Sequence, residues 1–174
     1  MYEFPAVKEC TDHSLDTLFE RMLKATEPLV LKGLVSDWPL VQSSGESNAS
    51  ARSYLLDYYQ GAPVTTFISK TDIKGRIFYT DDLKETNFNQ VKLPMTEVFE
   101  QLARLEAVEN PQTVYMGSAA VNLYLPGFRE QNGLPNMPDT TTVRIWIGNR
   151  TTVAAHYDAM DNVACVCAGR RRFT

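Results

Sequence analysis

Residues 141–147 place the strongest limit on how this chain can fold. Branched apolar residues occupy every second position of the segment and share one face: Val143, Ile145 and Ile147. Arg144 and Trp146 lie between them and point the other way. Alternation with a period of two is typical of a strand that is buried on one face and solvated on the other. The segment therefore predicts a half-buried strand in a sheet.

The residues that follow continue the strand pattern. Gly148-Asn149 predicts a turn, and residues 151–156 are strand-like again. Residues 162–168 form a small-residue apolar run with strand propensity, which Gly169 ends. We expect an antiparallel sheet here, with His156-Tyr157-Asp158 at its rim.

The His156-Tyr157-Asp158 tripeptide can hold a metal ion. Residues two apart in a strand point to the same side, so the His156 imidazole and the Asp158 carboxylate can meet at one metal. With a second imidazole from elsewhere they would form the two-His-one-carboxylate arrangement that holds Fe(II) and leaves one face open. The alternative is a solvated or hydrogen-bonded surface pair, because His-x-Asp also arises by chance.

Several segments together resemble a known family. They are Trp146-Ile147-Gly148, residues 151–158, Asn162, residues 168–173 and, in the N-terminal half, residues 28–34 with Asp37-Trp38-Pro39. The sequence resembles the cupin-like JmjC group of Fe(II)- and 2-oxoglutarate-dependent oxygenases, whose best-known member type is the asparaginyl hydroxylase that acts on hypoxia-inducible factor. Only the His-x-Asp block of this resemblance is specific.

The resemblance implies a fold and a cofactor site. The expected fold is mainly β with helical decoration, a double-stranded β-helix barrel forming a single domain over residues 1–174. His156 and Asp158 would be ligands of Fe(II). Arg171, at a position where the family more often has Lys, would pair with the distal carboxylate of the co-substrate 2-oxoglutarate, since a guanidinium binds carboxylates through two parallel hydrogen bonds. Arg170 and Arg172 should point to the opposite face of the strand as a solvated basic rim.

Three further residues have two interpretations each. Tyr115 resembles the phenol that helps to hold the same carboxylate, or is a core tyrosine with a satisfied hydroxyl. The family usually has a hydroxyl residue three positions before the His, where this chain has Val153, so either that hydrogen bond is lost or Thr152 supplies it. Asn162 either supports the metal site through hydrogen bonds or is a turn residue.

The third metal ligand of the family is a His on a late strand. The only other histidine is His13, which precedes a predicted helix and reads as a solvent-exposed or capping residue. We therefore expect the 174 residues to be the N-terminal portion of a barrel whose late strands lie outside this chain, and expect the chain alone to be inactive. A strand-borne His downstream would favour the enzyme.

Composition excludes several classes. With 44% hydrophobic and 22% charged residues the chain is of the globular type. A net charge of −4 argues against binding nucleic acid by bulk electrostatics, so any such contact would be local, through residues 170–172. No apolar run approaches the roughly 20 residues of a membrane span, and no signal peptide is evident, which predicts a cytoplasmic protein. Cys165 and Cys167 read as core residues rather than a metal pair.

The remaining segments predict helices and strands around the sheet. The predicted elements are a helix capped by Ser14, a strand from Pro28, a surface loop at 43–48, a short helix around Tyr54–Tyr59 that Gly61 ends, strands at 63–69 and 76–80 joined by a Lys74-Gly75 turn, a helix after Leu93-Pro94, a strand at 113–117 and a long loop at 126–139. A loop of that length is often a lid or a binding segment.

Three functions remain open at this point. The first is an oxygenase that hydroxylates a C–H bond of a protein side chain, with a small molecule or a modified RNA base as other substrates. The second is a catalytically silent cupin that serves as a binding or assembly module. The third is a cupin metalloenzyme with another metal, such as an isomerase, although such proteins show more clustered His ligands than this chain has.

Overall fold

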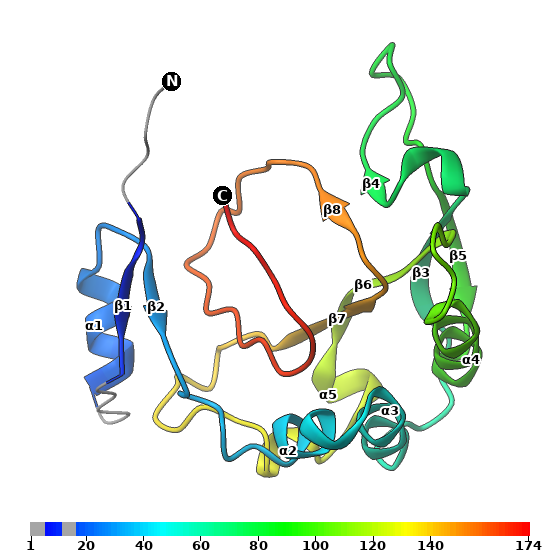
Figure 1. The fold of residues 1–174 in the computed structure, drawn as a ribbon. Coiled ribbons are helices and arrows are strands. Elements are labelled where there is room, and N and C mark those ends of the chain that lie inside the picture. Colours follow the sequence, from blue (N-terminus) through cyan, green and yellow to red (C-terminus); the bar gives the residue numbers. More distant parts are fainter. Residues whose placement is uncertain (1–5, 12–16) are drawn as a thin grey trace.

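The computed structural model describes residues 6–11 and 17–174 (Figure 1). In chain order the elements are β1 (Lys8–Cys10), α1 (Leu18–Lys24), β2 (Leu29–Leu31), α2 (Pro39–Glu46), α3 (Asn48–Leu56), β3 (Val64–Ser69), the 3-10 turn η2 (Thr71–Ile73), β4 (Arg76–Ile77), β5 (Asn89–Leu93), α4 (Met95–Leu105), β6 (Thr113–Ala120), α5 (Val121–Tyr124), the 3-10 turn η3 (Phe128–Glu130), β7 (Arg144–Gly148) and β8 (Thr152–Val153). The predicted Ser14 cap and His13 lie outside the described residues. No helix in the described ranges is both long and apolar enough to cross a bilayer.

A four-stranded antiparallel sheet in the order β5-β3-β6-β7 forms the centre of the structure. Its strand β7 confirms the alternation predicted for 141–147, because Ile145 and Ile147 are half-buried while Arg144 and Trp146 are exposed. The two isoleucines pack against the main hydrophobic core. That core therefore lies on one face of the sheet.

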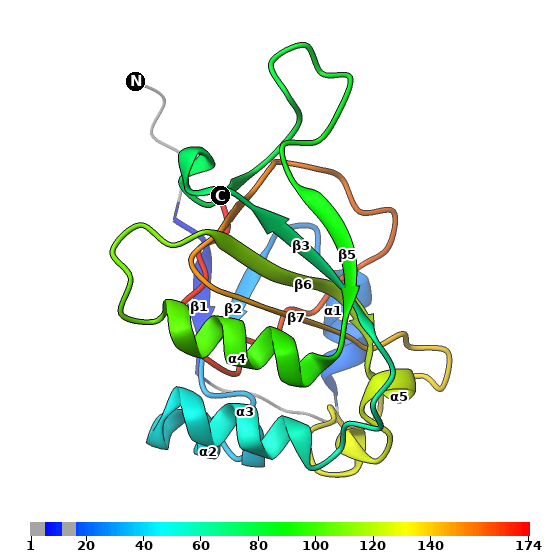
Figure 2. The ribbon, with the colours of Figure 1, turned by 90° about the vertical axis from the view of Figure 1, so that its right-hand side faces the viewer.

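Helix α4 covers this core face, as Figure 2 shows. Pro94 precedes the helix, and Val98, Phe99 and Leu102 recur at helical spacing and are buried. Residues with a period of 3.6 form a stripe that packs on the sheet, so the predicted helix after Leu93-Pro94 is confirmed. An ion pair between Arg52 and Glu106 joins α3 to the end of α4.

Two small parallel pairs flank the sheet. Strands β1 and β2 pair with each other beside α1, and Figure 1 shows them at the side opposite to α4. Strand β4 pairs with β8, with Arg76 opposite Thr152 and Ile77 opposite Val153. The expectation of a longer antiparallel strand at 151–156 was therefore wrong. Its ordered part spans two residues and runs parallel to β4, because the turn before β4 brings the Gly75 carbonyl to the Thr152 N–H at 2.9 Å.

The predicted surface loop at 43–48 is helical instead. Helix α2 starts at Pro39 after the extended residue Trp38, continues through the serines to Glu46, and buries Leu40. Ser47 then caps α3 by accepting a hydrogen bond from the Ser50 N–H at 2.9 Å. Packing of the helix outweighs the weak helix propensity of its serine and glycine residues.

Residues 162–168 do not form a strand, which corrects the second strand prediction. Cys165 and Cys167 are half-buried and Val166 is exposed, so the side chains alternate as in a strand. The backbone has no ladder partner among the described residues; one contact is the Ser44 hydroxyl, which donates to the Cys167 carbonyl at 2.6 Å. Strand propensity alone cannot make a sheet without a neighbouring backbone. Burial raises the pKa of the Cys167 thiol to about 11.

The long loop at 126–139 is anchored rather than free. Phe128 is buried, and the Asn132 side chain, 2% exposed, bridges three segments. Its oxygen accepts from the Leu40 N–H at 3.0 Å, and its nitrogen donates to the Tyr54 hydroxyl at 2.8 Å and to the Phe128 carbonyl at 3.2 Å. These bonds fix the first half of the loop to α2 and α3, which argues against a lid.

Candidate metal and carboxylate-binding site

His156 and Asp158 lie on the segment that follows β8. Their side chains are 61% and 63% exposed, and His156 Nε2 is 3.8 Å from Asp158 Oδ1. The spacing of two residues therefore does bring the imidazole and the carboxylate to the same side. Both groups are open to solvent and accessible to a ligand.

The tautomer of His156 follows from its other ring nitrogen. Nδ1 lies 2.8 Å from the Ala154 carbonyl oxygen. A carbonyl can only accept, so Nδ1 carries a hydrogen, and in the neutral imidazole Nε2, on the side of Asp158, is the nitrogen with the lone pair. Metal-binding histidines are typically held in this way, with the second ring nitrogen donating to a carbonyl or carboxylate.

Asn162 orients the carboxylate. Its side-chain nitrogen donates to Asp158 Oδ2 at 3.2 Å and to the Met160 carbonyl at 3.0 Å. The hydrogen bond occupies Oδ2 and leaves Oδ1 facing the imidazole. Asn162 is thus in contact with the carboxylate that it was predicted to support, and also ties together the bend after Asp158.

The donor set fits a divalent metal in part. Two adjacent ligands that each stand about 2.1 Å from an octahedral metal are about 3 Å apart, so Nε2 and Oδ1 would have to approach by about 0.8 Å. Exposed side chains can make that adjustment by small rotations. Across residues 6–11 and 17–174, however, no group of three or more His, Cys, Asp or Glu side chains could hold a metal ion. Among the described residues, His156 and Asp158 therefore offer two candidate metal donors and not three.

Tyr115 and Arg171, which are far apart in the sequence, meet in the structure. Tyr115 is on β6, between Phe67 of β3 and Gly148 of β7, and is 8% exposed. Burial raises the pKa of the Tyr115 phenol, and the positive charge of the nearby Arg171 guanidinium opposes this by lowering the pKa. A buried hydroxyl and a guanidinium with further N–H donors to spare are suited to binding a carboxylate.

A comparison with known families identifies the family of the fold. The model of the family described as cupin-like domain matches residues 15–174. The chain belongs to the cupin-like family. No curated protein matches it. The predicted cupin fold, mainly β with helical decoration, is confirmed, although the described strands do not close into a barrel.

The other predicted site residues of this cupin-like chain are exposed to solvent. Thr152 pairs with Arg76 through β8 and β4 and is exposed, and within the described ranges its hydroxyl has no hydrogen-bond partner. Arg170, Arg171 and Arg172 are all exposed on a segment without strand structure, so the predicted division of the three side chains between two faces stays a prediction. The structure thus joins Tyr115 to Arg171 and Asp158 to Asn162, and leaves Thr152 apart.

Sequence reasoning missed the role of Asn149 at this end of the cupin-like sheet. Its side-chain oxygen accepts from the Val114 N–H at 3.2 Å, and its side-chain nitrogen donates to the Gln112 carbonyl at 2.7 Å. Gly148-Asn149 was interpreted as a turn signal, and nothing in the dipeptide shows that the Asn side chain reaches across to β6.

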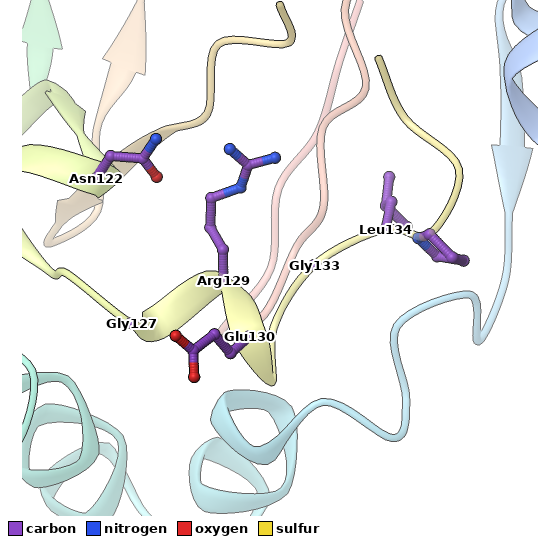
Figure 3. Close-up of a pocket in the computed structure, with 7 residues that line it drawn as sticks. Asn122, Gly127, Arg129, Glu130, Gly133 and Leu134 are labelled. Atoms are coloured by element: carbon purple, nitrogen blue, oxygen red, sulfur yellow. The ribbon is translucent and has the colours of Figure 1, made fainter. Parts of the chain in front are cut away.

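A separate hollow of about 580 Å³ lies in the anchored loop (Figure 3). It is lined by Asn122, Gly127, Arg129, Glu130, Gly133, Leu134 and Pro135. The Arg129 guanidinium and the Asn122 amide extend into the same open space, whereas the Glu130 carboxylate points away from that guanidinium. None of the predicted metal or co-substrate residues lines this hollow.

Proposed function

We propose that this cupin-like protein is an Fe(II)- and 2-oxoglutarate-dependent oxygenase that hydroxylates a C–H bond of its substrate. The observation that carries the proposal is the orientation of the two metal donors. Ala154 leaves His156 Nε2 with a free lone pair, and Asn162 turns Asp158 so that Oδ1 faces it. A surface pair formed by chance would need neither of these constraints.

His156 and Asp158 would hold the iron, and Asn162 would keep the carboxylate in place. The bound metal would supply the redox chemistry that activates oxygen. The protein's own residues supply position, which for a reaction of this kind accounts for much of the rate enhancement. A third ligand would have to come from outside the described residues.

Arg171 and Tyr115 would bind the distal carboxylate of 2-oxoglutarate. The guanidinium would offer two parallel N–H donors, and the phenol would add a third donor from a largely buried position. Thr152 has a free, exposed hydroxyl and is the remaining candidate for a further hydrogen bond to the co-substrate.

The substrate we propose is a protein side chain, which is the usual substrate in the family that the sequence resembles. The chain carries a net charge of −4, which gives no support to a nucleic-acid substrate bound through its phosphates. A small molecule remains the next choice.

The second candidate function is a catalytically silent cupin-like binding module. The observation that favours it is that residues 6–11 and 17–174 bring together two metal donors and no cluster of three. Such a protein would keep the fold and bind a partner without turning over 2-oxoglutarate.

A metal titration of the full-length protein distinguishes the oxygenase from the catalytically silent binding module. We expect it to bind Fe(II), Mn(II) or Ni(II), and expect Asp158→Ala to weaken binding at least tenfold, because loss of one ligand removes a large share of a three-ligand site. Asp161→Ala, in an exposed neighbour on the same segment, should leave the affinity unchanged. Thermal unfolding of the two variants should match the parent, since the core supplies the stability. Equal affinity in the parent and Asp158→Ala would exclude Asp158 as a ligand, and absence of succinate formation from 2-oxoglutarate would favour the binding module.

A further inference from the structure

Two aromatic rings of the central sheet lie over glycines of the neighbouring strand. A Cβ atom added at Gly117 of β6 would stand 2.7 Å from the Phe67 ring of β3. A Cβ added at Gly148 of β7 would stand 2.5 Å from Cδ2 of the Tyr115 ring of β6. Each ring thus occupies the space that a side chain on the next strand would take, a known way for an aromatic to cover a strand glycine.

Gly148 is needed for space and not for its backbone angles. Its φ does not lie in the left-handed region, so an alanine could adopt the same backbone conformation. The obstacle is contact. Besides the Tyr115 ring, the added Cβ would meet the Val114 carbonyl oxygen at 2.9 Å and the Tyr115 Cα at 3.1 Å.

The strand end cannot move away to relieve that contact. The Asn149 backbone N–H donates to the Val114 carbonyl at 3.2 Å, and the Asn149 side chain bonds to the Val114 N–H and the Gln112 carbonyl. These three hydrogen bonds hold β7 against β6 at the residue directly after Gly148. An alanine at 148 would therefore displace the Tyr115 ring.

The opposite side of the ring is also occupied. The Phe67 ring stacks on Tyr115 with centroids 6.2 Å apart and planes at 29°, and Phe88 packs on Phe67 with centroids 4.8 Å apart. Phe67 on one side and the backbone of Gly148 on the other confine the Tyr115 ring to one position. In that position the phenol lies near the Arg171 guanidinium, whose positive charge lowers the pKa of the phenol.

We propose that Gly148 is a positioning residue, whose missing side chain seats the Tyr115 ring so that its hydroxyl meets Arg171. If the proposed function holds, Gly148 also sets the affinity for the distal carboxylate of 2-oxoglutarate. It does so because it determines where the Tyr115 hydroxyl, one of the hydrogen-bond donors to that carboxylate, lies. The alternative is that Gly148 serves only the bend that begins at Asn149.

The decisive test follows Tyr115 itself and does not depend on activity. In full-length protein labelled with 3-fluorotyrosine, the ¹⁹F resonance of Tyr115 is assigned by its loss in Tyr115→Phe. Arg171→Ala should shift this resonance and raise the pKa of the phenol in the parent, because the guanidinium lowers that pKa. In a Gly148→Ala background, Arg171→Ala should change neither, since the contact is already lost. An equal response to Arg171→Ala in both backgrounds would overturn the proposal.

The kinetic arm tests the link to the co-substrate. Gly148→Ala should raise the KM for 2-oxoglutarate about tenfold, as expected for loss of a hydrogen bond to a charged group, with a much smaller change in kcat. If the parent does not use 2-oxoglutarate at all, the proposed function fails while the fluorine experiment still decides the role of Gly148. An unchanged KM in an active enzyme would remove the co-substrate part of the proposal.

Two further variants control for a general effect of Gly→Ala substitution and for poor folding. Gly45→Ala lies within α2, where an added Cβ meets nothing within 4 Å, so it should leave the Tyr115 resonance in place. If Gly148→Ala folds poorly, Gly148→Ala with Tyr115→Leu should fold better, because the smaller side chain vacates the space that the new methyl group needs. A double variant no more stable than Gly148→Ala would show that the clash lies with the Val114 backbone and would overturn the seating role.

Discussion

Replacing Arg171 with alanine should separate co-substrate binding from substrate binding. The guanidinium has five N–H donors and lies near the Tyr115 hydroxyl, so two parallel donors can face a carboxylate beside the phenol. A hydrogen bond to a charged group contributes about 1.5–3 kcal/mol, or roughly ten- to hundredfold in affinity. Because Arg171 is exposed and solvent weakens such contacts, we expect the lower end, about a tenfold rise in KM for 2-oxoglutarate.

Steady-state kinetics on the full-length enzyme measures this effect. The KM for the hydroxylated substrate should change far less than the KM for 2-oxoglutarate. Arg171→Lys should recover part of the loss, because it restores the charge but not the paired donors. A second readout is the pKa of the Tyr115 phenol, which should rise in Arg171→Ala because the guanidinium that favours the phenolate is gone.

Arg170 and Arg172 are the matched controls. Alanine at either position should cost no more than about 0.5 kcal/mol, as for ordinary exposed side chains. A large effect at Arg170 or Arg172 with none at Arg171 would refute the assignment of the carboxylate anchor and shift the register of this segment by one residue. The metal ligands would be unaffected by that outcome.

Two other predictions concern the bonds that hold the loop and helices together. Asn132→Ala should lower the free energy of unfolding by about 2–4 kcal/mol in urea titrations, because the buried Leu40 N–H loses its acceptor; a loss under about 1 kcal/mol would contradict this. The hydrogen bond between the Tyr58 and Tyr54 hydroxyls, in which neutral Tyr58 donates, raises the pKa of Tyr58 to about 12, so the native state favours the neutral phenol. That stabilisation is complete below about pH 10 and is lost as the pH rises from about 10 to about 12. The free energy of unfolding of Tyr58→Phe should therefore fall less than that of the parent over this range. Parallel curves of unfolding free energy against pH for the two proteins would contradict the prediction.

Local periodicity explains which elements could be predicted. The alternation at 143–147 and the 3.6-residue spacing of Val98, Phe99 and Leu102 each specify one element and its buried face, and β7 and α4 confirm both. The predictions for residues 43–48 and 162–168 were wrong because the structure there depends on contacts with distant parts of the chain. The serines and glycine of residues 43–48 predict a loop, and packing of α2 outweighs that composition. Residues 162–168 have strand propensity and alternating burial, yet a strand also needs a partner backbone, which no local pattern supplies.

One part of the candidate site can likewise be predicted from the sequence, and another part cannot. The sequence by itself determined that His156 and Asp158 can share one side, because two-residue spacing is a property of the chain. Which atoms lie toward each other, Nε2 and Oδ1, was decided by the contacts of His156 with Ala154 and of Asp158 with Asn162 in the folded segment. Only the tertiary structure decided that Tyr115 lies near Arg171, a residue on a segment that pairs with no strand. It also decided that Gly148 lies beside the Tyr115 ring, because the register between β6 and β7 pairs these two residues. Register is set by pairing between distant parts of the chain, and a shift of one residue would turn the Tyr115 side chain to the other face of the sheet.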